Sequence, residues 1–278
     1  MSAAATVEAP SGKDRGDENF PVGSALIRRS LRPHVHAFYA FARQADDISD
    51  HEALSPEEKV ARLDRMEAVL LGAPGADAPS AVRLRQSLAE TGVTPRHSQD
   101  LLAAFRQDAT KLRYASWDEL MGYCALSAMP VGRHVLDLHG ESRDTYPASD
   151  PLCAALQVLN HLQDLASDLA RLDRCYLPGD LLGAAGGRIE DLAGSALTPA
   201  LRWVVDELLD RTAALNRAGA GLPRAVRDRW LRTECAVIVN LSRRLAGRLR
   251  REDPLAGRVK LRRGDVAGSV LRALGWLA

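Results

Sequence analysis

Residues 157–178 read QVLNHLQDLASDLARLDRCYLP and carry a polar stripe within an otherwise apolar helical pattern. On an α-helix, Gln157, Asn160, Asp164 and Asp168 fall at i, i+3, i+7 and i+11, which places them on one face. Leucines flank the stripe, so we expect this helix to lie inside the protein with the stripe facing a cavity. Buried carboxylates are costly unless a cation compensates them, and amide and carboxylate oxygens one turn apart suit Mg²⁺. The stretch therefore predicts a metal-binding helix.

The sequence FYAFARQADDISD carries a second stripe of chemically active side chains far earlier in the chain. Its members again follow the helical spacing i, i+4, i+7 and i+11: Tyr39, Arg43, Asp46 and Asp50. Asp47 lies beside this stripe, and an Arg43–Asp47 pair on a solvated face is the alternative interpretation. Because both stripes carry metal-binding oxygens, we predict that they form the two halves of one metal clamp.

The rest of the sequence predicts an all-α protein, because alternating β-branched patterns are nearly absent while Ala, Leu and Arg dominate. A helix that starts at Pro21 or Pro33 should carry the second stripe, and LLGAAGGRIED should be a glycine-rich connection. We expect further helices over 55–72, 80–91, 95–109, 116–139, 150–172, 198–219 and 223–251. No shift in composition marks a second domain, so we predict a flexible tail over 1–17 and one helical domain over 18–278.

Composition excludes several classes of protein. A formal net charge of +1 argues against a general binder of polyanions. The four cysteines lack zinc-type spacing and are interpreted as reduced thiols. Because the sequence has no apolar run of transmembrane length and its start lacks the apolar region of a signal peptide, we expect a cytoplasmic protein.

The two motifs together resemble a known family. DDISD, with an Arg three residues before it, and the later QxxNxxxDxxxD are similar to the head-to-head prenyl synthases, which make squalene, dehydrosqualene and phytoene. The resemblance runs from about Phe20 to the C-terminal helices. ENFPVGS, AFRQDATKLRY, YCALSAMPVGR and RCYLP are similar to the bacterial hydroxysqualene synthases of hopanoid biosynthesis.

The resemblance implies the isoprenoid-synthase fold, in which helices surround a deep apolar cavity with the two Asp motifs at its mouth. The implied Mg²⁺ ligands are Asp46, Asp50, Asn160 and Asp164, with Asp47 and Asp168 as further candidates. Arg43 and Tyr39 are implied to hold the diphosphate, and Phe20 and Gln157 to line the substrate site.

Two departures from the family pattern bear on the reaction. Condensing members have an Arg immediately before the second Asp motif, where this chain has Gln163. Condensation starts from two substrates that each carry a diphosphate. The loss of one cation therefore suits a substrate with a single diphosphate group to neutralise. Within YCALSAMPVGR, Pro130 predicts a kink, and Tyr123 and Ser127 are candidate catalytic residues that could face a cation and position a water. A simple packing kink and an ordinary buried tyrosine are the alternatives.

These features predict Mg²⁺-dependent ionisation of presqualene diphosphate, followed by rearrangement and water capture to give hydroxysqualene and diphosphate. We expect no NADPH, because the glycine-rich segment follows no strand and so lacks the context of a dinucleotide site. A condensing prenyltransferase that makes presqualene diphosphate, dehydrosqualene or phytoene is the alternative. A helical nucleic-acid-binding regulator is the non-enzyme alternative.

The regulator hypothesis rests on the basic stretch from Arg243 to Arg263, where nine Arg and Lys residues face only Glu252 and Asp253. The stretch lacks interleaved aromatic residues, so we expect no nucleic-acid partner. A solvated helix face is the simplest account. The functional interpretation of the basic stretch is a peripheral contact with anionic lipid, because the apolar sequence VAGSVLRALGWLA follows it. The neighbouring enzymes of the squalene pathway are further candidate partners.

Overall fold

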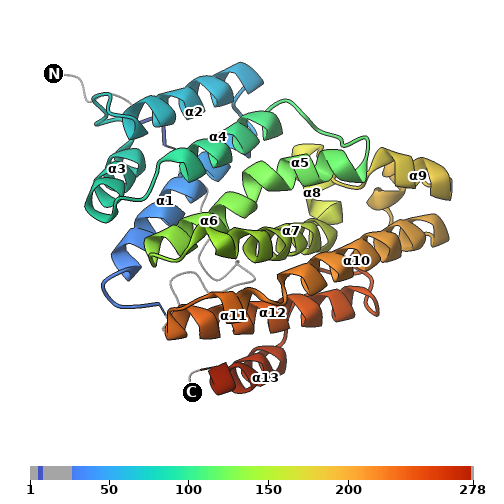
Figure 1. Ribbon diagram of the computed structural model, residues 1–278. Coiled ribbons are helices and arrows are strands. Elements are labelled where there is room, and N and C mark those ends of the chain that lie inside the picture. The colour runs from blue at the N-terminus through green and yellow to red at the C-terminus, as the bar shows by residue number, and fades with distance from the viewer. Residues whose placement is uncertain (1–5, 9–26, 277–278) are drawn as a thin grey trace.

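The computed structural model describes residues 6–8 and 27–276, and every regular element among them is helical (Figure 1). The α-helices are α1 (Arg32–Ser49), α2 (Pro56–Leu70), α3 (Pro79–Thr91), α4 (Arg96–Asp108), α5 (Trp117–Ser127), α6 (Met129–Leu138), α7 (Tyr146–Gln163), α8 (Leu165–Leu172), α9 (Gly179–Ala185), α10 (Pro199–Gly219), α11 (Leu222–Ala225), α12 (Arg229–Leu249) and α13 (Arg263–Ala273). Short 3₁₀ helices are η2 (Arg143–Thr145), η3 (Ile189–Ala193) and η4 (Leu274–Trp276). The all-α prediction is confirmed.

Local signals in the sequence account for several helix ends. Ser55 accepts a hydrogen bond from the backbone N–H of Glu58, and Glu58 accepts one from the backbone of Ser55, so a capping box starts α2. Pro33 lies in the first turn of α1, so that helix starts near the later of the two predicted prolines. The described part of the predicted tail lies against the connection between α2 and α3, where the N–H of Val7 donates to the carbonyl of Asp77 at 3.0 Å.

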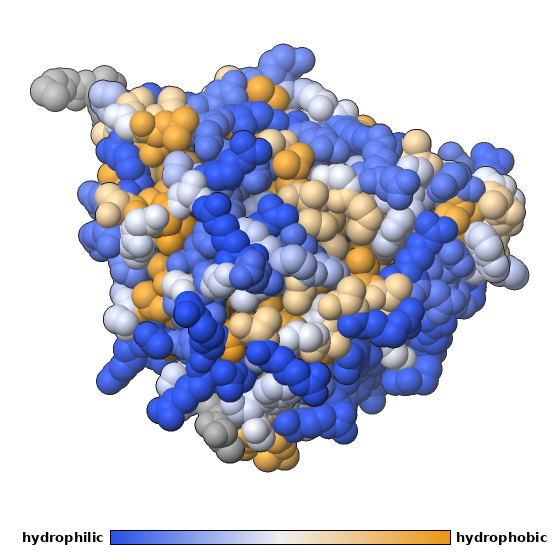
Figure 2. Space-filling view, in the orientation of Figure 1, coloured by the Kyte–Doolittle hydropathy of each residue, from blue (hydrophilic) through white to orange (hydrophobic). Residues whose placement is uncertain are grey.

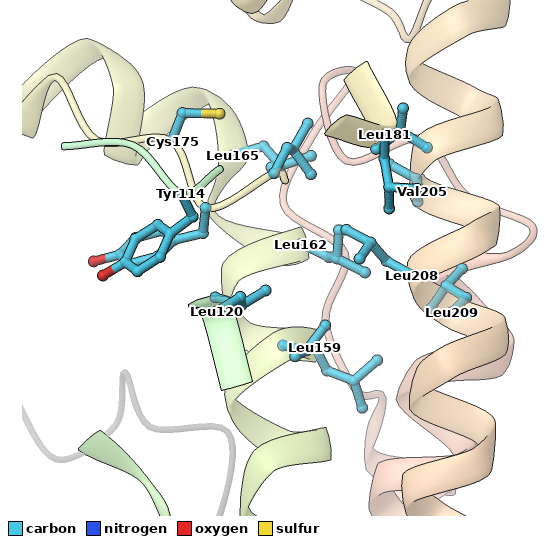
Figure 3. Packing of buried hydrophobic residues seen from close by; sticks show 14 of the residues in the cluster. Tyr114, Leu120, Leu159, Leu162, Leu165, Cys175, Leu181, Val205, Leu208 and Leu209 are labelled. Atoms are coloured by element: carbon cyan, nitrogen blue, oxygen red, sulfur yellow. The ribbon is translucent and has the colours of Figure 1, made fainter. Parts of the chain in front are cut away.

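Hydrophobic packing fixes α7 in the middle of the molecule. Leu159 and Leu162 on α7 belong to the same buried cluster as Leu208 and Leu209 on α10, and Figure 3 shows these side chains between the two helices. Burial of leucine side chains stabilises each by about 1.5–3 kcal/mol. The apolar side of α7 is thereby turned toward α10, which leaves its polar stripe to face another direction.

A second buried cluster fixes α1 in the same way. Phe41 and Ile48 of α1 are fully buried against Leu63 of α2, Leu84 of α3 and Leu102 of α4. These apolar positions lie between the members of the Tyr39-to-Asp50 stripe. Burial of one side of α1 therefore sets the direction of its polar side.

The predicted helix over 116–139 is wrong as one helix, because it breaks at Ala128 into α5 and α6. Ala128 has φ −121° and ψ −46°, outside the regular helix. Pro130 lies in the first turn of α6. Backbone N–H groups in a first turn have no intrahelical acceptor, so the missing N–H of proline costs no hydrogen bond there. The kink predicted from Pro130 is therefore present as a complete break.

The predicted helix over 150–172 is also wrong as one helix. It begins earlier, at Tyr146, with Pro147 in its first turn, and it breaks at Asp164 into α7 and α8. Asp164 has φ −107° and ψ 12°. Aspartate favours such positions because its short polar side chain competes with helical hydrogen bonding. The stripe from Gln157 to Asp168 therefore continues across two helices.

The glycine-rich segment is more ordered than we expected. Instead of an open connection it forms α9 and η3, because Leu181 and Leu182 are buried in the main cluster and a short helix turns both inward. Gly186 ends α9 with φ +66°, a left-handed conformation that glycine adopts without strain.

The four cysteines are all free. Over residues 6–8 and 27–276, no helix has both the length and the apolar content needed to cross a bilayer.

Candidate active site

The two stripes meet at one cavity of about 560 Å³. α1, α4, α5, α7, α8 and two loops contribute its lining. The lining residues are Tyr39, Ala42, Arg43, Asp46, Asp50, Phe105, Asp108, Tyr123, Ser127, Gln157, Asn160, His161, Asp164, Ser167, Asp168, Arg171, Leu172, Arg174, Tyr176 and Arg258. The lining is mostly polar, so the structure describes the polar end of the site, and the apolar chamber implied for a prenyl chain stays a prediction.

The structure brings almost all the predicted site residues together. Those that line the cavity are Tyr39, Arg43, Asp46, Asp50, Tyr123, Ser127, Gln157, Asn160, Asp164 and Asp168. Asp47 does not: it is buried in α1, and its Oδ1 lies 3.1 Å from the Nε of Arg43. Phe20 lies outside the described residues. Asp47 is therefore better placed to hold Arg43 than to reach a metal ion.

Arg43 and Asp50 show how the α1 half of the site is organised. Arg43 pairs within the helix with Asp47 and, at 3.4 Å, with Asp46, so the predicted intrahelical pair exists. It also lines the cavity, which a purely solvated pair would not do. Asp50 accepts a hydrogen bond at 2.7 Å from Nη1 of Arg174, whose other amine donates to the carbonyl of Ser49 at 2.9 Å. Arg174 therefore ties the end of α1 to the segment after α8.

The α7–α8 half is organised by the loop before α13. Arg258 holds Asp164 with two hydrogen bonds, Nε to Oδ1 at 2.6 Å and Nη2 to Oδ2 at 2.9 Å. The side-chain amide of Gln163 donates to the carbonyl of Val259 at 2.5 Å and so fixes the loop beside Arg258. Gln163 removes the family's arginine from the sequence motif, but Arg258 places a guanidinium at the neighbouring aspartate. The site therefore carries a guanidinium beside this motif, supplied by the loop and not by the position of Gln163.

A buried carboxylate forms the centre of the remaining lining. Asp108 on α4 accepts hydrogen bonds from the hydroxyl of Tyr123 at 2.8 Å and from that of Tyr176 at 3.3 Å. Burial raises the pKa of Asp108 to about 6, although the charge of Arg174 and the hydrogen bond from Tyr123 oppose this shift. Burial also raises the pKa of both tyrosines well above the usual value. At neutral pH this network therefore holds an ionised carboxylate between two protonated phenols.

His161 completes an aromatic wall beside this carboxylate. Its ring stacks on Tyr176 with ring centroids 3.5 Å apart, and its Nε2 lies 3.2 Å from the side-chain amide of Gln157. Burial, and then the positive charge of Arg174, lower the pKa of His161 to about 3. The imidazole therefore stays neutral at physiological pH and adds no repulsion against a cationic species in the cavity.

Ser127 ends α5 at the break before Pro130. Its Oγ is buried, lines the cavity and has no hydrogen-bond partner among residues 6–8 and 27–276. An unpaired buried hydroxyl is costly, and a bound water would satisfy it. This geometry fits the predicted role of Ser127 in positioning water.

The charges of the lining fit a divalent cation. Five aspartates and four arginines line the cavity, so its own formal charge is about −1. A diphosphate ester adds further negative charge, which the arginines alone do not balance. As the side chains lie, no three Asp, Glu, His or Cys residues of the described chain form a metal cluster, and arginines hold Asp50 and Asp164. Mg²⁺ commonly takes one or two carboxylates and completes its shell with phosphate and water, so this donor set suits it.

Sequence reasoning missed several lining residues, notably Asp108, His161, Arg174, Tyr176 and Arg258. A signal existed for four of them. AFRQDATKLRY contains Asp108, and RCYLP contains Arg174 and Tyr176, but both segments served only to support the resemblance. His161 follows Gln157 by one helical turn and could have been assigned to the stripe. Nothing in the sequence around Arg258 points to a site.

Comparisons with known proteins show which family the chain belongs to. The squalene/phytoene synthase family model matches residues 13–265. Hydroxysqualene synthase from Rhodopseudomonas palustris is 50% identical over 255 residues, which cover 92% of this chain and 87% of the relative. Hydroxysqualene synthase from Zymomonas mobilis is 43% identical over 270 residues, covering 96% and 90%.

Solved structures show the same architecture. The crystal structure of squalene synthase HpnC from Alicyclobacillus acidocaldarius matches with a TM-score of 0.74 and 32% identity, over 85% of this chain and 90% of that chain. A dehydrosqualene synthase matches with a TM-score of 0.80 at 20% identity, over 94% and 92%, which shows the fold alone. The protein is thus an α-helical enzyme with the isoprenoid-synthase fold. It belongs to the squalene/phytoene synthase family.

Proposed function

We propose that this protein ionises presqualene diphosphate in a Mg²⁺-dependent step and that water captures the rearranged cation, giving hydroxysqualene and diphosphate. The observation that carries this proposal is a single cavity in which an aspartate–arginine end meets the buried Tyr123–Asp108 pair. Identity of 43–50% to hydroxysqualene synthases, against 32% to a phytoene synthase, favours water capture over condensation.

The polar end would bind and orient the diphosphate. The oxygens of Asp46, Asp50, Asn160 and Asp164 are the donors for Mg²⁺, which when bound neutralises charge on the departing group as a Lewis acid. Arg43 presents a planar fork of N–H donors to phosphate oxygens, and Tyr39 lies one turn before it. These interactions strengthen as charge develops on the leaving oxygen, which lowers the barrier to ionisation.

The aromatic end would receive the cation and the water. Tyr123, Tyr176 and neutral His161 present π faces that attract positive charge. As the oxygen of a water held at Ser127 bonds to the cationic carbon, the resulting oxonium must lose a proton. Tyr123 is placed to take that proton while its own passes to Asp108, leaving a neutral alcohol and a protonated carboxyl group.

The experiment that tests this proposal supplies purified protein and Mg²⁺ with either presqualene diphosphate or farnesyl diphosphate, without NADPH. We expect presqualene diphosphate to give hydroxysqualene, identified by mass spectrometry, and farnesyl diphosphate to remain unchanged. Condensing activity is the second candidate, because Arg258 places a guanidinium beside the second Asp motif. Formation of presqualene diphosphate, dehydrosqualene or phytoene from shorter precursors would establish it instead.

The Arg43→Lys variant tests whether Arg43 binds the diphosphate. We expect kcat/KM to fall by at least about tenfold, because a point ammonium cannot reproduce two parallel hydrogen bonds to phosphate. An intrahelical pair alone is worth about 0.2–0.5 kcal/mol, so the alternative predicts a nearly silent substitution. Arg96→Lys is the matched control, because Arg96 also pairs at i,i+4, with Asp100, but does not line the cavity. Unchanged kcat/KM in Arg43→Lys would rule out the binding role.

A further inference from the structure

The outward face of α13 is apolar. Val266, Val270 and Leu274 follow one another at four-residue intervals, and Leu271 lies beside them. All four are exposed, and at 69% Leu271 is the most exposed large hydrophobic side chain of the described residues. In the space-filling view, hydrophobic side chains gather at the lower tip of the molecule, where Figure 1 shows α13 (Figure 2). Such a cluster on one helix differs from the single exposed hydrophobics common on protein surfaces.

The inner face of α13 is already satisfied by α12. Ser269 and Ala273 are fully buried, and α13 packs along α12. The only carboxylate of α13, Asp265, turns inward, where Arg248 donates to it at 2.7 Å and Arg244 at 3.4 Å. The apolar outer face is therefore not a core face awaiting a partner within the described chain.

The positive charge around this face is available to a partner. Lys260, Arg263 and Arg272 are exposed and make no ion pair within residues 27–276. Other arginines of the C-terminal region, Arg248, Arg250 and Arg258, are already paired with Asp265, Asp210 and Asp164. The outer face thus combines an apolar stripe with cations and carries no carboxylate.

We propose that the α13 face, defined as Val266, Val270, Leu271 and Leu274 with Lys260, Arg263 and Arg272, docks on an anionic lipid leaflet. A helix of this kind lies in the plane of the headgroups, with its apolar side chains at the boundary of the acyl chains and its cations on the phosphates. A second copy of this chain fits less well, because a two-fold contact would bring the cations of both copies together. This inference stands independently of which diphosphate the cavity takes.

Sedimentation of the full chain with vesicles tests this proposal. We expect binding to vesicles that contain phosphatidylglycerol, weak binding to pure phosphatidylcholine, and loss of binding as salt is raised. Leu271→Glu should lower the partition coefficient at least about tenfold, because it places a charge at the apolar boundary. Arg263→Gln and Arg272→Gln should each lower it about fivefold on anionic vesicles only.

Trp203→Glu is the matched control, because Trp203 is 48% exposed on α10, where the nearby arginines Arg202 and Arg211 are already paired with Asp206 and Glu207. We expect this variant to bind vesicles like the unmodified protein. Circular dichroism of all variants should remain helical, since the substituted side chains are exposed. Equal binding of Leu271→Glu and the unmodified chain would overturn the proposal. The proposal would also be overturned if the unmodified chain bound no vesicles and formed a dimer that Leu271→Glu dissociates. That result would assign the α13 face to a contact with a second copy.

Discussion

The Asp46→Asn and Asp164→Asn variants are each expected to lose at least about a hundredfold in kcat/KM on the diphosphate substrate while keeping their helical content. Each change removes a charged oxygen from the cavity, where it would help to hold the Mg²⁺ that balances the diphosphate. Steady-state kinetics over a range of Mg²⁺ concentrations measures the effect. Loss of a metal ligand should also raise the concentration of Mg²⁺ needed for half-maximal rate.

Asp173→Asn is the matched control for the second motif. Asp173 lies just after α8 with φ 50°, a conformation that Asn tolerates well, and it does not line the cavity. Its pair with Arg113 is exposed, so its removal should change activity by less than about twofold. Full activity in Asp46→Asn or Asp164→Asn would show that the stripes are ordinary polar faces and would remove the basis for the metal site.

The second large effect is expected at Asp108. If Asp108 takes the proton released during water capture, Asp108→Asn should lower the formation of hydroxysqualene about a hundredfold or more, the usual contribution of a general base. Release of diphosphate should fall much less, because ionisation precedes capture and uses the other end of the cavity. Measuring the alcohol and the released diphosphate in the same reaction separates these two steps. Equal losses in both would assign Asp108 a purely structural role.

Stability gives an independent check on Asp108. Its pKa is about 6 in the folded chain, against about 3.9 for an unperturbed Asp, so the folded state binds more protons between these values. The contribution of Asp108 to the free energy of unfolding should therefore fall as pH rises from about 4 to about 6 and then level off. Asn carries no charge to bury, so Asp108→Asn should flatten this dependence, as measured by urea unfolding across the interval. The raised pKa of Asp108 would be contradicted if the free energy of unfolding rose with pH through this interval equally in the unmodified protein and in Asp108→Asn.

A tyrosine pair supplies the control for the proton path. Tyr123→Phe removes the hydroxyl that joins the cavity to Asp108 and should shift products away from the alcohol, as Asp108→Asn does. Tyr114 stacks on Tyr176 in the same buried cluster but does not line the cavity. Tyr114→Phe should therefore leave the product ratio unchanged. A similar shift in both variants would point to general loosening of the cluster.

The elements that sequence reasoning predicted well are those specified by neighbours along the chain. Ser55 and Glu58 mark the start of α2, and the apolar spacing of Phe41 and Ile48 gives α1 its buried side. Helical periodicity also placed each stripe on one face, because a turn of helix brings residues three and four apart together whatever surrounds them. All eight members of the two stripes consequently line the cavity.

Periodicity failed where the backbone leaves the regular helix. The leucine pattern continues through Asp164, yet the chain leaves the helix there, and the carboxylate is held by Arg258 from a loop far along the sequence. Asp47 is adjacent in sequence to the metal-ligand candidate Asp46, but tertiary packing buries it, and it pairs with Arg43. A stripe specifies a face, whereas only the packed neighbours decide which residue of that face reaches the cavity.

The sequence by itself determined the helical class, the two aspartate stripes and the resemblance to prenyl synthases, because each depends on residue type and local spacing. Only the tertiary structure decided that Asp108, His161 and Tyr176 form one aromatic and acidic wall, and that Arg258 places a guanidinium on Asp164. These residues come from separate helices and loops, and burial sets the pKa of Asp108 and His161. Burial depends on every element packed around a group, so no local pattern in the sequence encodes it.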